Sequence, residues 1–387
     1  MLILKRFILT LLTVLSLCGR IFSQCDTTYR VALMMPFYLD QVDEATYGRS
    51  PSPKTLLQKP FSYIQFYEGF MMAVDSIAAS KGLCIDLLVY DVTPDVSLID
   101  DVLNDTWLAD ADLIVGPFHA KQFEQVAKFA VEHNIPIVNP VTNRKSLVND
   151  NPTAVKTKPC EDAQMESLQR LLESKYADSK VFVVNVKGEP SNEIEKIWSI
   201  AENVVGSEAV DVDLSQKDGC EMMKNGSSHE KENVVIVYAD DKAVAAEAVN
   251  VINRYADDFE ITLVTLPKWG RYDGLFDDYL VKMKTVFFDD VFIDYNDVGV
   301  QRFVCGFRSK YVTEPTDYAF MGFDTGWYFL NALNQFGREF PYNLGGLDIN
   351  LLSTEYRFAT DYFNGQENTH WNIYQYVNYE KVLISID

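Results

Sequence analysis

Residues 112–141 read DLIVGPFHAKQFEQVAKFAVEHNIPIVNPV. An apolar run at 112–117 is followed by apolar residues at helical spacing over 121–133, and then by a second apolar run at 135–141. LIVG at 113–116 and PIV at 136–138 are continuously apolar, as strands buried on both faces of a sheet must be. A strand, a helix and a strand in this order predict a parallel sheet with covering helices.

The same alternation extends in both directions from this stretch. Upstream, we expect a strand at 29–37, a helix at 62–79 that Gly82 ends, a strand at 84–92 and a helix at 96–109. After the periodicity lapses at 149–158, a second series begins. Its expected helices are 162–174, 192–205 and 243–255, and its expected strands are 180–186, 209–214, 233–239 and 260–266.

A third section supplies too few strands for a domain of its own. It contains an expected strand at 285–293, a helix at 298–311 and the helical stretch GFDTGWYFLNAL at 322–333, which we interpret as core packing. These elements must complete the earlier sheets, so the chain crosses several times between two doubly wound α/β lobes and forms a hinge. We assign residues 28–148 and about 294–350 to lobe 1, and about 149–293 and 351–387 to lobe 2.

Two polar stretches are expected to be loops. Residues 41–60 are rich in Pro, Ser and Gly, and residues 217–232 contain a run of Asn, Gly and Ser. The first is long enough to form a lid, but a surface insertion is the preferred interpretation.

Residues 1–24 have the pattern of a secretory signal peptide. Lys5 and Arg6 precede an apolar run at 7–17, and the small residue Ser23 adjoins Gln24. The apolar run is shorter than the roughly 20 residues that span a membrane. We therefore expect cleavage near Ser23/Gln24 and a periplasmic or otherwise extracytoplasmic chain.

Lipid anchoring is the less favoured alternative. An acylated cysteine follows a small residue, whereas Cys18 follows Leu17 and Cys25 follows Gln24. Asp26, directly after Cys25, keeps the alternative open.

The composition argues against a nucleic-acid partner. The net charge is −22 and the sequence pI is about 4.6. Removing the three positive charges of Lys5, Arg6 and Arg20 with the signal peptide changes −22 to −25. A phosphate backbone requires a basic face, so nucleic-acid binding is disfavoured.

The cysteines and acidic pairs give no indication of catalysis or metal binding. The five cysteines after residue 24 are an odd number, have no CxxC spacing, and are expected to be mostly buried small residues. GxSxG, HExxH, P-loop and GxGxxG motifs are absent from the sequence. We interpret Asp289 and Asp290, within a strand-like run, as a bend. We expect no enzyme activity, no cofactor and no metal.

Several stretches carry a family resemblance across nearly the whole chain after residue 30. They are VALMMPFYLD at 31–40, FYEGFMMAVDS at 66–76, DLIVGPF at 112–118, IPIVNPVTN at 135–143, EPTDYAFMGFD at 314–324 and the terminal stretch 368–386. They resemble the type I periplasmic-binding family of amino-acid ABC-transporter binding proteins and receptor ligand-binding regions, and more closely a branch found in Bacteroidetes. The chain has no LysM-like repeat, so peptidoglycan binding by longer relatives does not carry over.

The resemblance implies an extracytoplasmic solute-binding protein that closes on a small polar ligand, an amino acid or a related compound. An inner-membrane permease of an ABC transporter would be its partner. The alternative is a ligand-free envelope interaction or assembly module, whose partner would be an envelope protein.

Candidate ligand contacts follow the apolar strands, because ligands of open parallel sheets bind beyond the carboxyl ends of the strands. They are Phe118, His119, Lys121, Thr142 and Asn143 in lobe 1, and Asn185, Lys187, Tyr238, Asp240 and Trp269 in lobe 2.

In relatives, the two lobe 1 loops hold the α-carboxylate and amine of the ligand, often through hydroxyl groups. Thr142 fits this role, whereas His119 and Lys121 depart from it. We expect the His119 ring to bond its own backbone at the start of a helix. For the other candidates, capping or solvent exposure is an equally open alternative.

Overall fold

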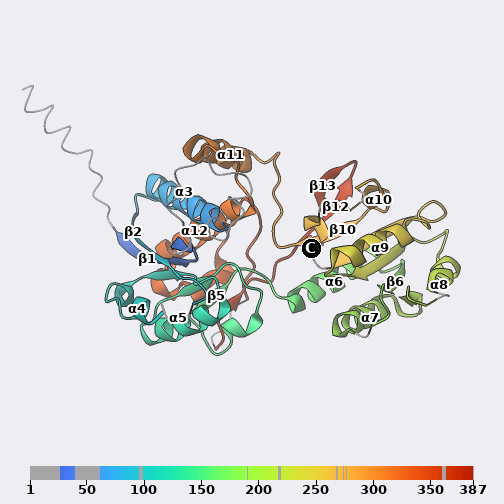
Figure 1. The fold of residues 1–387 in the computed structure, drawn as a ribbon, viewed down its shortest axis with the longest axis horizontal. Helices are drawn as coiled ribbons and strands as arrows, with labels where there is room; N and C mark the ends of the chain where they lie inside the picture. The colour runs from blue at the N-terminus through green and yellow to red at the C-terminus, as the bar shows by residue number, and fades with distance from the viewer. Residues whose placement is uncertain are drawn as a thin grey trace, which may run out of the picture.

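The computed structural model describes two α/β lobes side by side (Figure 1). The described residues are 27–39, 62–95, 99–189, 191–216, 219–266, 269–272, 274–275, 277–359 and 363–386. The expected signal peptide and the expected loop at 41–60 lie outside them. No helix among the described residues is long and apolar enough to cross a membrane.

Lobe 1 contains a parallel six-stranded sheet of order β11-β5-β4-β3-β1-β2. Its strands are β1 (Thr28–Met35), β2 (Cys84–Asp91), β3 (Leu113–Val115), β4 (Ile137–Asn139), β5 (Ala154–Lys156) and β11 (Gln366–Glu367). Its helices are α3 (Ile64–Lys81), α4 (Ile99–Leu103), α5 (Ala120–Glu132), α11 (Val298–Tyr311) and α12 (Asp317–Phe336), with 3-10 turns at Leu108–Asp110, Lys145–Val148 and Gly337–Gly346.

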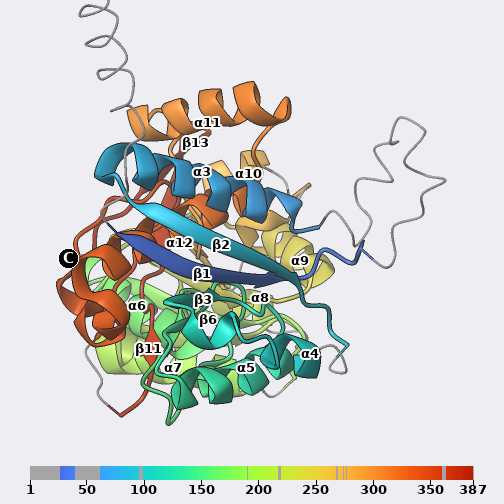
Figure 2. The same ribbon diagram turned by 90° about the vertical axis from the view of Figure 1, so that its left-hand side faces the viewer.

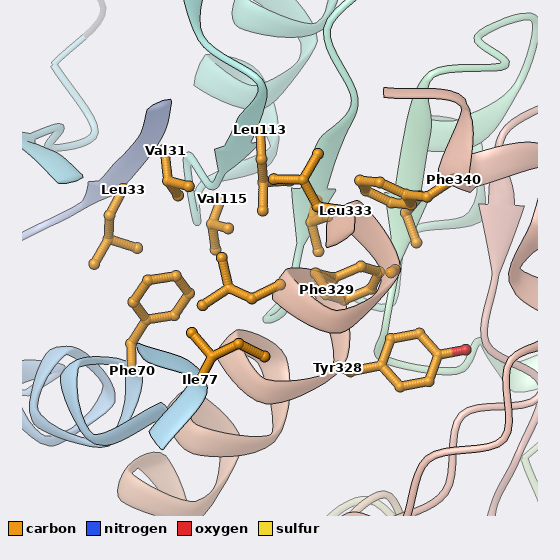
Figure 3. Packing of buried hydrophobic residues seen from close by; sticks show 14 of the residues in the cluster. Val31, Leu33, Phe70, Ile77, Leu113, Val115, Tyr328, Phe329, Leu333 and Phe340 are labelled. Carbon is orange, nitrogen blue, oxygen red and sulfur yellow. The ribbon is translucent and has the colours of Figure 1, made fainter. Parts of the chain in front are cut away.

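Alternating side chains of β1 fill two cores, one on each face of this sheet. Val31 and Leu33 pack against α3 and α12, whereas Ala32 and Met34 pack against α4 and α5 (Figures 2 and 3). Helix α11 forms an outer layer over α3 and α12. The sheet is therefore buried on both faces, as its apolar strands predict.

Helices α3 and α12 approach closely because glycine occupies the contact. A Cβ atom on Gly69 would lie 1.9 Å from the Ala319 carbonyl oxygen, and one on Gly322 would lie 2.0 Å from that of Phe66. Helix α12 also supplies Phe329 and Leu333 to the core shown in Figure 3. The interpretation of GFDTGWYFLNAL as a packing helix is confirmed.

Lobe 2 contains a seven-stranded sheet of order β13-β12-β10-β9-β8-β6-β7. Its strands are β6 (Lys180–Asn185), β7 (Ala209–Asp213), β8 (Asn233–Tyr238), β9 (Ile261–Leu266), β10 (Val286–Asp289), β12 (Asn372–Val377) and β13 (Glu380–Leu383). The last two are antiparallel to their neighbours. Its helices are α6 (Glu161–Lys175), α7 (Asn192–Val205), α8 (Gly219–Gly226), α9 (Lys242–Ile252) and α10 (Asp277–Lys282), with 3-10 turns at Gly206–Glu208 and Trp269–Arg271.

Within the described part of the chain, three crossovers join the lobes, at residues 157–160, 290–297 and 368–371 (Figure 1). They follow β5, β10 and β11 respectively. The predicted fold class, two doubly wound lobes with a hinge of several crossovers, is confirmed.

Short elements account for the differences from the expected pattern. Strand β5 lies where the periodicity lapses, and both β5 and β11 join the lobe 1 sheet, although our boundaries assign residues 149–158 and 351–387 to lobe 2. Strands of three and two residues carry too little pattern to be recognised. The expected loop at 217–232 is wrong where it contains α8, and the expected helix at 96–109 is replaced over its described part by α4 and a 3-10 turn.

The cysteines also differ in part from expectation. Cys84 is disulfide-bonded. Cys160 is a buried thiol, as expected, but Cys220 is half-buried and Cys305 is exposed.

Candidate functional site

The two candidate loops of lobe 1 are joined by one buried side chain, that of Asn139 at the end of β4. Its Nδ2 donates to the carbonyl oxygens of Pro117 (2.8 Å) and Phe118 (3.4 Å). Its Oδ1 accepts from the backbone N–H groups of Val141 (3.0 Å) and Thr142 (2.8 Å). The loops after β3 and β4 therefore form one connected unit.

Phe118 anchors this unit in the core. Its side chain is 3% exposed and makes edge-to-face contacts with Tyr63 and Phe66, at centroid distances of 5.2 and 4.9 Å. The Phe118 ring is therefore packed against aromatic side chains within lobe 1.

His119 is the N-cap residue of α5, but its side chain makes no capping hydrogen bond. Its Nε2 lies 3.4 Å from the hydroxyl of Tyr38 instead. The segment around Tyr38 is fixed by Asp91, whose carboxylate accepts from the N–H groups of Phe37, Tyr38 and Leu39. The expected cap by the ring is absent at the start of α5, and a tyrosine hydroxyl from the loop after β1 reaches the ring at Nε2.

The loop after β4 presents polar groups at the surface of lobe 1. The Thr142 hydroxyl accepts from the Arg144 N–H at 3.3 Å, which leaves the hydroxyl proton for another acceptor. The Asn143 side chain is exposed. Lys121 is also exposed, in the first turn of α5.

In lobe 2, two of the candidate side chains are used within their own loops or core. Asn185 closes the loop after β6, donating to the Glu189 carbonyl (2.9 Å) and accepting from the Gly188 N–H (2.9 Å). Trp269 is 1% exposed, and its indole N–H donates to the Ala239 carbonyl (2.9 Å). The Trp269 ring therefore lies in the core of lobe 2.

The remaining lobe 2 candidates lie closer to solvent. Tyr238 is half-buried, and burial together with the nearby carboxylates of Glu161 and Glu193 raises the pKa of its hydroxyl. Asp240 is exposed, and its carbonyl accepts from the Tyr272 hydroxyl at 2.6 Å. Lys187 is exposed after β6.

A pocket lies where two of the crossovers meet lobe 1. It is lined by Pro140, Thr157, Lys158, Asp290, Val291, Met321, Ser353, Thr354 and Tyr356. Its volume of about 20 Å³ is enough for a single water molecule. This enclosed volume alone does not surround a ligand of amino-acid size.

The pocket contains an ion pair that the sequence interpretation missed. Lys158 Nζ lies 2.9 Å from Asp290 Oδ2, and the two side chains are 14% and 5% exposed. The interpretation of Asp290 as part of a bend overlooked this partner. Lys158 and Asp290 each lie within two residues of the end of a buried strand. Thr142 was selected because it follows a buried strand, and the same criterion could have selected these two residues.

Among the described residues, no group of three or more His, Cys, Asp or Glu side chains could hold a metal ion.

No family model matches the chain, and no curated protein matches it either. Solved structures do match. A Rhodospirillum rubrum protein described as a branched-chain amino acid ABC transporter has a TM-score of 0.68 at 13% identity, covering 92% of this chain and 100% of its own. The type I periplasmic-binding fold is thereby established for this chain.

Two further structures share this fold at lower similarity. An ABC-transporter substrate-binding protein from Desulfitobacterium hafniense, solved with Leu, has a TM-score of 0.53 at 14% identity and covers 92% and 100% of the two chains. Full-length LpoA from Haemophilus influenzae has a TM-score of 0.54 at 12% identity, covering 92% of this chain but 59% of its own. Identities this low establish the fold alone.

Proposed function

We propose that the chain is an extracytoplasmic solute-binding protein whose lobes close on a small polar ligand, an amino acid or a related compound. The observation that carries this proposal is the loop of Thr142, which offers a hydroxyl proton at the edge of a lobe joined to its neighbour by three crossovers. A ligand that contacts both lobes stabilises the closed form and shifts the population toward it.

The comparisons support this class of ligand. The Desulfitobacterium hafniense protein was solved with Leu, and the Rhodospirillum rubrum protein is described in terms of branched-chain amino acid transport. An inner-membrane permease is the partner that such a protein would deliver its ligand to. The sequence stretches at 31–40 and 314–324 support placement in the branch found in Bacteroidetes.

The disulfide of Cys84 supports an exported location, because structural disulfides are rare in reducing compartments. We propose a signal peptide cleaved near Ser23/Gln24, with a free rather than lipid-anchored N-terminus.

The proposal is tested by thermal-shift measurements on the mature chain with the twenty amino acids, dipeptides and muropeptides. A ligand at about 100 times its Kd stabilises the folded state by roughly 2.7 kcal/mol, which raises Tm measurably. Native mass spectrometry of the hit confirms the stoichiometry. A raised Tm with one bound molecule supports the proposal, and no shift across the three libraries contradicts it.

A second candidate function is a ligand-free module that binds an envelope protein. The small volume of the hinge pocket and the fold shared with LpoA favour it. Recovery of one envelope protein by affinity purification, together with silence in the thermal-shift screen, would support this function over the first.

A further inference from the structure

The last residue of β5, Lys156, is a charged residue with no exposed surface. Its ammonium group contacts three oxygen atoms: Glu367 Oε1 at 2.8 Å, the Lys158 carbonyl at 2.5 Å and the Asn143 carbonyl at 3.5 Å. Since an ammonium group has three protons, these contacts use its full donor capacity.

The three acceptors belong to three different parts of the molecule. The Asn143 carbonyl is in the candidate ligand loop after β4, the Lys158 carbonyl is in the first crossover, and Glu367 ends β11, directly before the third crossover. The Lys156 side chain therefore contacts the loop after β4, the first crossover and the residue that directly precedes the third crossover.

The hinge segments are also connected to each other around Lys156. Glu367 Oε1 accepts from the Cys160 N–H at 2.9 Å. Asn368 donates from its backbone N–H to the Lys156 carbonyl and from its Nδ2 to the Thr157 carbonyl, both at 2.8 Å. A shift of the ammonium group would therefore be transmitted to both crossovers.

The buried ion pair of Lys156 and Glu367 is not expected to add much to the free energy of unfolding, because desolvation of the two charges offsets their attraction. Burial lowers the pKa of Lys156, whereas its hydrogen bond to Glu367 opposes that change. Buried ion pairs are often no more stabilising than apolar residues of the same volume. The geometry fixed by the ammonium group is thus a stronger reason for a lysine here than the free energy of unfolding.

We propose that Lys156 is a positioning residue that couples the Thr142–Asn143 loop to the hinge, so that the loop conformation and the interlobe angle change together. That the loop contacts a ligand rests on the proposed function, but the coupling itself does not require a ligand. A ligand that draws the loop outward would move the Asn143 carbonyl, and Lys156 would convey this change to the crossovers.

The test compares two double variants of the mature chain without ligand. Lys156→Met with Glu367→Gln removes the ammonium group without leaving a buried charge unpaired. Lys310→Met with Asp75→Asn is the control: it makes the analogous changes at a more exposed ion pair, between α11 and α3 at 2.6 Å, away from the crossovers.

Two quantities are measured. Spin labels on Lys128→Cys in lobe 1 and Lys224→Cys in lobe 2, both at exposed positions, report the interlobe distance distribution by pulsed electron resonance. Cys220 and Cys305 are replaced by Ser in every sample. Amide exchange of the peptide covering residues 140–145 reports the loop.

For the Lys156 variant we expect a broader or displaced distance distribution together with faster exchange of the loop, while the control matches the parent in both. A change in only one of the two quantities, or in neither, overturns the coupling. If the double variant fails to unfold cooperatively, Lys156→Gln with Glu367→Gln, which keeps polar side chains at both positions but removes the ammonium group, is judged by the same two measurements. The thermal-shift screen tests the solute-binding function separately, so either proposal can fail without the other.

Discussion

Asn139 and Lys156 lie directly opposite each other on the parallel strands β4 and β5, and neither has any exposed surface. Asn139 joins the loops after β3 and β4, and Lys156 joins the second of these loops to the hinge. The backbone adds a further link, because the Thr157 N–H donates to the Asn139 carbonyl at 3.1 Å. A polar path thus runs from the loop after β3 to the third crossover through two opposed residues.

Replacing Asn139 should destabilise the chain and loosen both loops. Asn139→Leu leaves two carbonyl oxygens and two N–H groups without their partner, which should cost about 3 kcal/mol or more. Chemical denaturation measures the loss. Amide exchange should increase at Val141 and Thr142 while remaining unchanged in lobe 2.

Asn139→Asp, measured at a pH where the introduced carboxyl is ionised, is the matched variant, because it retains the acceptor for Val141 and Thr142 and loses the donor to Pro117. In this variant, the amides of the loop after β4 should stay protected from exchange, whereas those of the loop after β3 should exchange faster. Equal protection of both loops in the Asp and Leu variants would show that Asn139 does not connect them.

The fold could be predicted from the sequence because its long strands and helices have clear periods. Helices α7 and α11 occupy the expected residues, and the apolar strands β6, β8 and β9 begin within about a residue of expectation. Strands β5 and β11 could not be predicted, because their few residues are held by neighbours distant in sequence. The ends of both strands carry Lys156 and Glu367, so the sequence predicted the hinge but not the contacts of these two residues within it.

The candidate site was only partly predictable, for a different reason. The position after a buried strand selects loop residues, but it does not reveal which side chains turn inward. Phe118 and Trp269 meet the criterion and lie in cores, while Lys158 and Asp290 meet it and line the pocket. Asn139 is marked only as an amide within an apolar strand, and its four partners could be identified only from the structure.

Asp324 should make stability depend on pH in an unusual direction. It is fully buried on α12 and accepts from the Leu352 N–H, the Ser353 N–H and the Ser353 hydroxyl, at 2.7, 2.9 and 2.6 Å. Burial raises its pKa from 3.8 to about 6. Because the folded chain binds this proton more tightly than the unfolded chain, the contribution of Asp324 is greatest at low pH and is lost as the pH rises through this range.

Asp324→Asn cannot ionise, so any constant effect of the substitution is independent of pH. The stability of the parent minus that of the variant should therefore fall by on the order of 2 kcal/mol between about pH 4 and pH 7. Denaturation of both proteins across this range measures the difference. A difference that is flat, or that increases with pH, would contradict the assignment.

Reduction of the Cys84 disulfide should lower the thermal stability of lobe 1. Cys84 begins β2, and its N–H donates to the Thr27 carbonyl at 3.1 Å, beside the start of β1. Structural disulfides typically contribute about 2–4 kcal/mol. Calorimetry with and without a phosphine reductant should show a lower Tm on reduction. Cys84→Ser, which lacks the bond, should show no change in Tm with the reductant. An equal change in this variant would show that the reductant acts somewhere other than the Cys84 disulfide.

If the thermal-shift screen yields a ligand, Thr142 should contribute more to its affinity than His119. The Thr142 hydroxyl accepts from Arg144 and keeps its proton, whereas the His119 ring faces Tyr38. Thr142→Ala should therefore remove one hydrogen bond to a charged group and weaken binding by roughly 1.5–3 kcal/mol, while His119→Ala should change the affinity little. Isothermal titration of both variants measures the ranking. Thr142→Ser retains the hydroxyl and should bind like the parent. Unchanged affinity in Thr142→Ala with a large loss in His119→Ala would move the ligand from the loop after β4 to the start of α5.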